Sequence, residues 1–137
     1  MKLSSEDKKN LSTVRFDKAE EFLDDARANL QESRSKTAVN RSYYAVLNAV
    51  RSLLILEGVN PETHSGALTT LSLRFIKQGL LPTQVVKDMK LLLSRRADVD
   101  YGDFESIDIE EAEDSVKKAE KLLEQIDTVR RKLIAEL

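Results

Sequence analysis

The chain has 137 residues, with 22 Lys or Arg against 24 Asp or Glu, and its formal net charge of -2 gives no general attraction to nucleic acid or to an acidic membrane. It has no Cys and one His, which excludes disulfides, thiolate chemistry and His-rich metal clusters, so we expect neither metal nor cofactor. Four Gly and two Pro are too few to punctuate a sheet, and the composition predicts an all-α protein.

The chain opens with a polar segment, residues 1–13, of helical character, which either Ser4 or Ser5 could cap. From Val14, apolar residues recur at helical spacing and predict a first helix that ends near Arg34. These apolar residues are Ala19, Phe22, Leu23, Ala26 and Leu30.

The most apolar segment, residues 37–57, predicts a second helix that Gly58 and Pro61 bring to an end. One of its stripes is small and would let a neighbouring helix approach closely: Ala38, Ser42, Ala45, Ala49 and Ser52. Another is bulky: Val39, Tyr43, Val46, Val50 and Leu54. With two such stripes the helix should be central in a bundle. Its remaining stripe is polar and must face solvent, a partner or a site: Asn40, Tyr44, Asn48 and Arg51.

Three further helices complete the predicted bundle. Residues 66–78 form a short helix that Gly79 ends, and Pro82 opens a fourth helix that reaches Arg95 and Arg96. Residues 97–106 lack an apolar period and predict a loop. Asp108, with Glu111 three residues later, resembles a capping box that starts a fifth helix reaching the C-terminus.

The connections are short, which favours an antiparallel up-and-down helical bundle with four principal helices plus a shorter one. We expect a single domain over residues 1–137, with the bundle at residues 14–135. No apolar run approaches the roughly 20 residues of a membrane span, and the charged start lacks a signal-peptide core, so we expect no membrane contact and a cytoplasmic location.

The segment after the fourth helix is rich in groups able to bind phosphate or one another: Arg95, Arg96, Asp98, Asp100 and Tyr101. A purely structural interpretation is also open. The two arginines could complement the carbonyl groups at a helix C-terminus and pair with the nearby carboxylates.

Several short segments, in their order and spacing, resemble the HEPN domain family. They are Asn40, Arg41, Ser42, Tyr43, Tyr44 and Ala45, then Leu53, Leu54 and Gly58, then His64, Ser65 and Gly66, then Phe75, Ile76, Lys77, Gln78 and Gly79, and finally Arg96, Asp100 and Tyr101. More narrowly, the chain resembles the small stand-alone prokaryotic HEPN proteins grouped as UPF0332. The resemblance covers about residues 14–135.

The resemblance implies a helical bundle that commonly dimerises. Many HEPN domains are metal-independent ribonucleases, often toxins, whose site joins an Arg to a His four to six residues beyond it. Others accompany a nucleotidyltransferase as a binding or regulatory module. In some toxin members, a Tyr just after that His accepts adenylate from the partner.

This sequence departs from the nuclease motif, because the positions after Arg95 and Arg96 hold no His. They hold Asp100, Tyr101, Gly102 and Asp103. RNA cleavage without metal needs a group with a pKa near neutrality, which imidazole supplies and a carboxyl or phenol ordinarily does not.

The one His, His64, could reach the site from another loop or subunit, or could instead hydrogen-bond at the start of the third helix. We expect Tyr43 in the core and Tyr44 at a surface or interface, without excluding a stacking role on an RNA base. If the second helix lies beside the arginines, Asn40, Asn48 and Arg51 line a polar cleft.

We therefore expect a homodimeric HEPN module, weakly active or not an enzyme, that works with a nucleotidyltransferase-like partner in a pair of the toxin–antitoxin kind. Nucleotide or RNA phosphate binding would fall to the residues Arg95, Arg96, Asn40, Tyr44, Asn48, Arg51 and His64. Tyr101 is the preferred acceptor for modification. Two alternatives stay open. One is a ribonuclease toxin in which Arg96, Asp100 and Tyr101 are catalytic, and the other is a helical interaction protein whose last helix offers its apolar face to a partner.

Overall fold

The computed structural model describes residues 2–102 and 107–137, and every regular element in these ranges is helical. The prediction of an all-α protein is therefore confirmed. The elements are α1 (Ser5–Gln31), α2 (Ser35–Leu54), the 3₁₀ turn η1 (Ile55–Glu57), α3 (His64–Leu71), the π-helical turn η2 (Ser72–Ile76), α4 (Gln84–Tyr101) and α5 (Ile109–Glu136).

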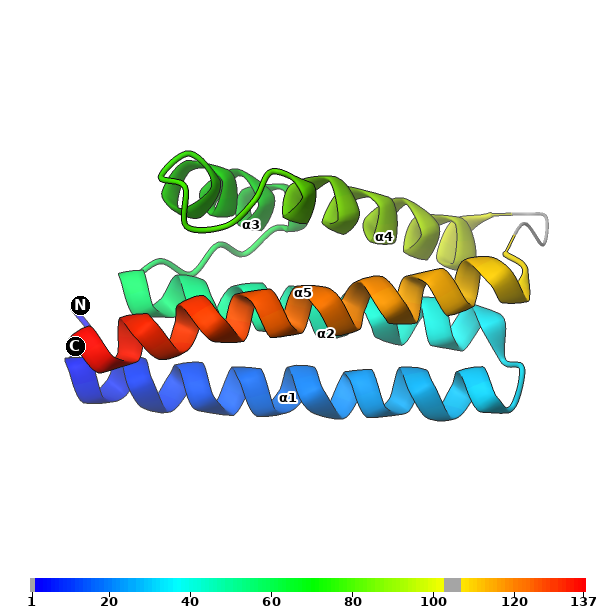
Figure 1. The fold of residues 1–137 in the computed structure, drawn as a ribbon, viewed down its shortest axis with the longest axis horizontal. Helices are drawn as coiled ribbons and strands as arrows, with labels where there is room; N and C mark the ends of the chain where they lie inside the picture. The colour runs from blue at the N-terminus through cyan, green and yellow to red at the C-terminus, as the bar shows by residue number, and fades with distance from the viewer. Residues whose placement is uncertain (1, 103–106) are drawn as a thin grey trace.

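The four long helices lie side by side and alternate in direction along the chain (Figure 1). Helix α1 runs away from the end of the bundle that carries both termini, α2 returns, α4 runs out again and α5 comes back. The short α3 lies beside the start of α4, on the same side of α2. This is the predicted antiparallel bundle of four principal helices and a shorter one.

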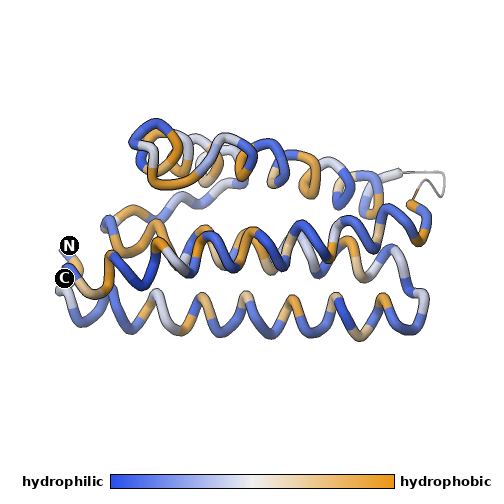
Figure 2. Tube along the Cα trace, in the orientation of Figure 1, coloured by the Kyte–Doolittle hydropathy of each residue, from blue (hydrophilic) through white to orange (hydrophobic). Residues whose placement is uncertain are grey.

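Helix α2 is the centre of the bundle, packing most extensively against α1, then α5, then α4. All members of its predicted small and bulky stripes are fully buried, from Ala38 and Val39 to Ser52 and Leu54. Apolar positions recur between hydrophilic ones along every helix (Figure 2). The core therefore forms as α2 removes two of its three faces from water, at roughly 1.5–3 kcal/mol for each large apolar side chain buried.

Helix α1 is longer at its start than the apolar pattern indicates. It begins at Ser5, after the Ser4 hydroxyl accepts a hydrogen bond from the Asp7 amide, so the polar lead-in is continuous with the first helix. It ends at Gln31 rather than near Arg34. The reason is local, because Ser33 takes a left-handed conformation (φ 59°) that reverses the chain into α2.

The predicted loop at residues 97–106 is wrong over its first five residues, because α4 continues to Tyr101. Two contacts stabilise this extra turn. Arg96 and Asp100 form an ion pair one helical turn apart, with Nε and Oδ2 separated by 2.7 Å, and Val99 packs against the core. Arg95 and Arg96 therefore lie within the helix and not at its C-terminus. Residues 103–106 of the expected loop are outside the described residues.

The remaining helix boundaries follow recognisable caps. Helix α3 begins at His64, two residues earlier than predicted, because the Thr63 hydroxyl accepts the Gly66 amide at 2.9 Å. Helix α4 begins at Gln84, just beyond Pro82. The capping box of α5 is confirmed, with the Asp108 side chain accepting the Glu111 amide at 2.8 Å. None of the helices in the described ranges is long and apolar enough to cross a membrane.

Candidate functional site: an arginine among three tyrosines and the single histidine

Three helices bring the chemically distinctive side chains of the chain together. Helix α2 contributes Tyr43 and Tyr44, α3 contributes His64 as its first residue, and α4 contributes Arg96, Asp100 and Tyr101. We call these six residues the Arg96 cluster.

Arg96 is the centre of the cluster. Its guanidinium carbon lies 5.9 Å from the ring centroid of Tyr43, 5.6 Å from that of Tyr44 and 5.8 Å from that of Tyr101. These distances suit cation–π attraction. Since Asp100 pairs with Nε and the Arg96 side chain is only 13% exposed, most of this positive charge is compensated inside the protein. Arg96 therefore orients the rings around it more than it offers a free cation to solvent.

His64 joins the cluster through Tyr43. The Tyr43 hydroxyl and His64 Nδ1 are hydrogen-bond partners, and the two ring centroids lie 5.4 Å apart. Burial raises the pKa of Tyr43 to about 12, so its phenol keeps its proton. The role that sequence reasoning considered for His64, a hydrogen bond at the start of its helix, is filled by Thr63 instead.

The surroundings of His64 favour the uncharged form of its imidazole. Burial is the first cause that lowers its pKa, and the cations Arg96 and Arg51 lower it further. If the protonated Tyr43 phenol donates to Nδ1, the ring proton of neutral His64 is on Nε2, which then donates a hydrogen bond. This arrangement suits contact with a phosphate oxygen better than removal of a proton from RNA.

The three tyrosines differ sharply in exposure. Tyr43 is fully buried, Tyr44 is half-buried against Phe22 with ring centroids 6.0 Å apart, and Tyr101 is 76% exposed. Tyr101 therefore presents its hydroxyl to solvent while its ring remains beside Arg96. The predicted core position of Tyr43 is correct. The sequence does not predict its contact with His64, which lies 21 residues further along the chain.

Arg95 lies apart from this cluster. Its Nη1 donates to Asp114 Oδ2 at 2.8 Å and to Ser115 Oγ at 3.0 Å, and the side chain is only 14% exposed. Asp114 also pairs with Lys118, and the hydrogen bonds from Lys118 and Arg95 help to hold its pKa below the ordinary value against the opposing effect of burial. Arg95 therefore ties α4 to α5, which leaves it poorly placed to bind a ligand.

The polar stripe of α2 does not line one cleft. Asn40 accepts a hydrogen bond from Arg41 Nη1 at 3.1 Å and lines a pocket whose far wall includes Val99. Asn48 and Arg51 line a different pocket, toward α1. Tyr44, under Arg96, lies between them along the helix. The expected polar cleft is thus two separate pockets on either side of the Arg96 cluster.

The described residues contain no group of three His, Asp or Glu side chains placed to hold a metal ion.

The apolar face of α5 is packed in the core, which leaves little apolar surface on this helix for a partner helix. The buried positions are Ala112, Val116, Ala119, Leu122, Leu123, Ile126 and Val129. The arrangement that remains is a helical bundle whose polar centre is the Arg96 cluster.

Comparison with known proteins agrees with this class. The model of the HEPN domain matches residues 13–129. The chain is 35% identical over 120 residues to a UPF0332 protein of Thermotoga maritima, which is 88% of each chain. Two proteins of Methanocaldococcus jannaschii named "Putative toxin" are 26% and 34% identical to it, over 85% and 72% of this chain and 86% and 67% of their own lengths. The chain belongs to the HEPN domain family.

Proposed function

We propose that this chain is a toxin-like HEPN module that works with a nucleotidyltransferase-like partner, and that the Tyr101 hydroxyl is the group the partner modifies. The observation that carries the proposal is the exposure of Tyr101, 76% against solvent, beside the Arg96 guanidinium. The HEPN match and the relatives named as toxins support the module and its context.

The chemistry would be transfer of adenylate from ATP. The Tyr101 oxygen forms a bond to the α-phosphorus, the bond from that phosphorus to the β-phosphate bridging oxygen breaks, and pyrophosphate leaves. The phenol proton passes to a base on the partner. Arg96, paired with Asp100 and largely buried, holds the Tyr101 ring beside it and so orients the phenol that accepts the adenylate.

The surroundings of the three tyrosines of the chain support Tyr101 as the acceptor. Tyr43 has a raised pKa and is fully buried, so an enzyme could not reach it without unfolding the bundle. Tyr44 is half-buried beneath Arg96. Only Tyr101 combines an exposed hydroxyl with a nearby cation.

The test is co-expression with a nucleotidyltransferase-like protein, followed by mass spectrometry of the intact chain and its peptides. We expect one adenylate on Tyr101, lost in Tyr101→Phe and retained in Tyr44→Phe, the matched control. Adenylate on another side chain would refute the choice of Tyr101. A partner that neither modifies nor binds the chain would refute the pairing.

A second candidate is metal-independent RNA cleavage, in which the Nε2–H group of His64 would contact the phosphate as a donor and not act as the base. The imidazole absent from the family's usual place reaches the Arg96 cluster from α3 instead. If this is the activity, purified protein cleaves RNA in the presence of a chelator, and both Arg96→Ala and His64→Gln abolish cleavage while Lys77→Gln does not. Cleavage that survives both substitutions would contradict this assignment.

A further inference from the structure

A second polar region lies between α1 and α2, away from Tyr101. Here a pocket with a volume of about 510 Å³ is lined by Arg15 and Lys18 of α1, by Asn48 and Arg51 of α2, and by Asn60 and Glu62 of the segment before α3. The two helices each supply a pair of residues three apart, which places each pair on one helical face. The pocket therefore follows from the antiparallel packing of α1 on α2.

The charges of this pocket are not balanced within the protein. Among the described residues, no carboxylate lies within ion-pair distance of Arg15, Lys18 or Arg51, and Glu62 is the one acidic residue of the lining. Most other arginines that are half-buried, such as Arg95, Arg96 and Arg130, have carboxylate partners. Three cations against one carboxylate leave an excess of two positive charges.

The Arg15 side chain reaches the main chain of Arg51, and both arginines are partly removed from water. Arg15 Nη1 donates to the main-chain oxygen of Arg51 at 3.4 Å, and the nearby charge of Arg51, after burial, lowers the pKa of Arg15. Arg51 Nε is buried with no hydrogen-bond partner among the described residues. Buried or adjacent like charges without an anion are costly, so the protein carries an electrostatic strain here that a bound anion would relieve.

We propose that this pocket binds a phosphate group, held by Arg15, Lys18 and Arg51. Guanidinium groups match the oxygens of a phosphate through paired hydrogen bonds, and a dianion neutralises the excess charge of the lining. The carboxamides of Asn48 and Asn60 add neutral donors and acceptors beside it. The volume also accommodates a ligand larger than a free phosphate, such as a nucleoside monophosphate.

The test is titration of the full chain with inorganic phosphate, pyrophosphate and AMP at low ionic strength, followed by amide chemical shifts and calorimetry. We expect shifts grouped at Arg15, Lys18, Asn48 and Arg51. Affinity should fall about tenfold or more in Arg15→Gln and again in Arg15→Gln/Lys18→Gln, because each change removes a charged contact. Equal affinity for phosphate and AMP identifies the phosphate alone as the ligand, and tighter AMP binding identifies a nucleotide.

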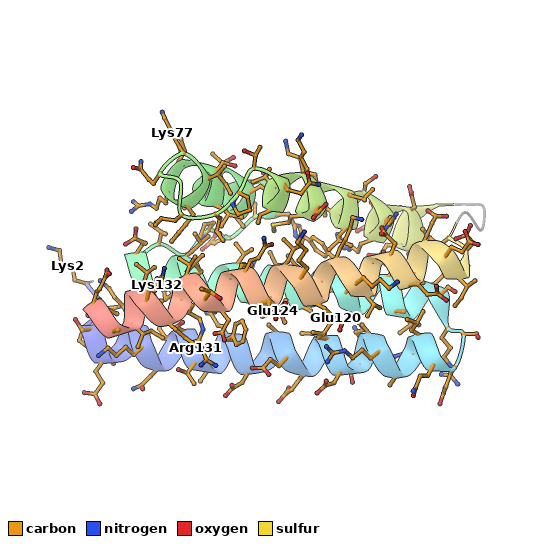
Figure 3. All side chains as sticks on the ribbon, in the orientation of Figure 1. Lys2, Lys77, Glu120, Glu124, Arg131 and Lys132 are labelled. Carbon is orange, nitrogen blue, oxygen red and sulfur yellow. The ribbon has the colours of Figure 1, made fainter. Side chains whose placement is uncertain are left out.

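The matched control is Lys77→Gln, since Lys77 lies beyond α3 and projects away from α1 (Figure 3). It should leave the affinity unchanged. No binding at millimolar phosphate, equal weakening by the control, or equally tight binding of succinate would overturn the proposal. The outcome is separable from the fate of the proposed function, because Tyr101→Phe should still bind phosphate and the Arg15→Gln/Lys18→Gln variant should still be modified on Tyr101.

Discussion

At the scale of single residues, Arg96 and Arg95 show how neighbours in the chain take different roles. Successive positions on a helix point about 100° apart, so one guanidinium meets the tyrosines of α2 while the other meets Asp114 and Ser115 of α5. The sequence shows two adjacent arginines and cannot show that only one faces the polar centre. That difference depends on how α4 is rotated against its neighbours, which is a matter of packing.

His64 gives the cluster a direct electrostatic readout, because it is the only imidazole in the chain. Its pKa in the folded protein lies below the ordinary value of about 6.5. We predict that Arg51→Gln raises the pKa of His64 toward that value, since the substitution removes a nearby cation. The measurement is an NMR titration of its ring protons, with Lys77→Gln as the control that leaves the pKa unchanged.

The same shift makes the stability of the protein depend on pH. Because the unfolded chain binds a proton to His64 more readily than the folded chain does, the contribution is fully present above about pH 6.5. It is lost as the pH falls from there through the lower folded pKa of His64. We predict that urea unfolding of His64→Gln shows a shallower fall in stability over this window. Identical slopes for the two proteins would contradict the lowered pKa.

At the scale of elements, the cap of α3 positions the histidine. Thr63 accepts the Gly66 amide and fixes where the helix begins, which places His64 at its first position against Tyr43. We predict that Thr63→Ala lowers the free energy of unfolding by about 1 kcal/mol and perturbs the His64 ring signals. Thr69→Ala, an exposed change within the same helix, should leave both nearly unchanged. Equal effects from both variants would show that the cap does not position His64.

The small stripe of α2 is the second element with a measurable role. Ala45 is fully buried, and enlarging it would force the packed helices apart. We predict that Ala45→Leu lowers the free energy of unfolding by about 1–3 kcal/mol or more. Ala28→Leu, the same change at an exposed position of α1, should stay within about 0.5 kcal/mol of the parent. A neutral Ala45→Leu would mean that α2 is less tightly enclosed than the structure describes.

Local sequence signals predict some helix faces and boundaries of this bundle and not others. The stripes of α2 and the capping box at Asp108 and Glu111 were predictable, because periodicity and caps are local signals. The last turn of α4 was not, because aspartates disfavour helix interiors, and only the Arg96–Asp100 pair and the packing of Val99 reverse that preference. The meeting of His64 with Tyr43 also depends on how the intervening segment folds back over α2.

At the scale of the whole molecule, two polar regions lie next to each other along α2, with Arg51 near both. Helices α3 and α4 cover the Arg96 cluster, and α1 forms the wall of the pocket at Arg15 and Lys18. Ion pairs such as Arg27 with Glu120, 2.9 Å apart, join α1 to α5, and Glu120 lies on the side of α5 toward α1 (Figure 3).

The central claim is that this HEPN module presents Tyr101 to a nucleotidyltransferase-like partner. The most direct measurement is site-resolved mass spectrometry of the chain after co-expression with a nucleotidyltransferase-like protein, alongside the Tyr101→Phe and Tyr44→Phe variants. The account predicts adenylate on Tyr101, abolished by the first substitution and unaffected by the second. An unmodified chain, or adenylate that persists in Tyr101→Phe, would contradict it.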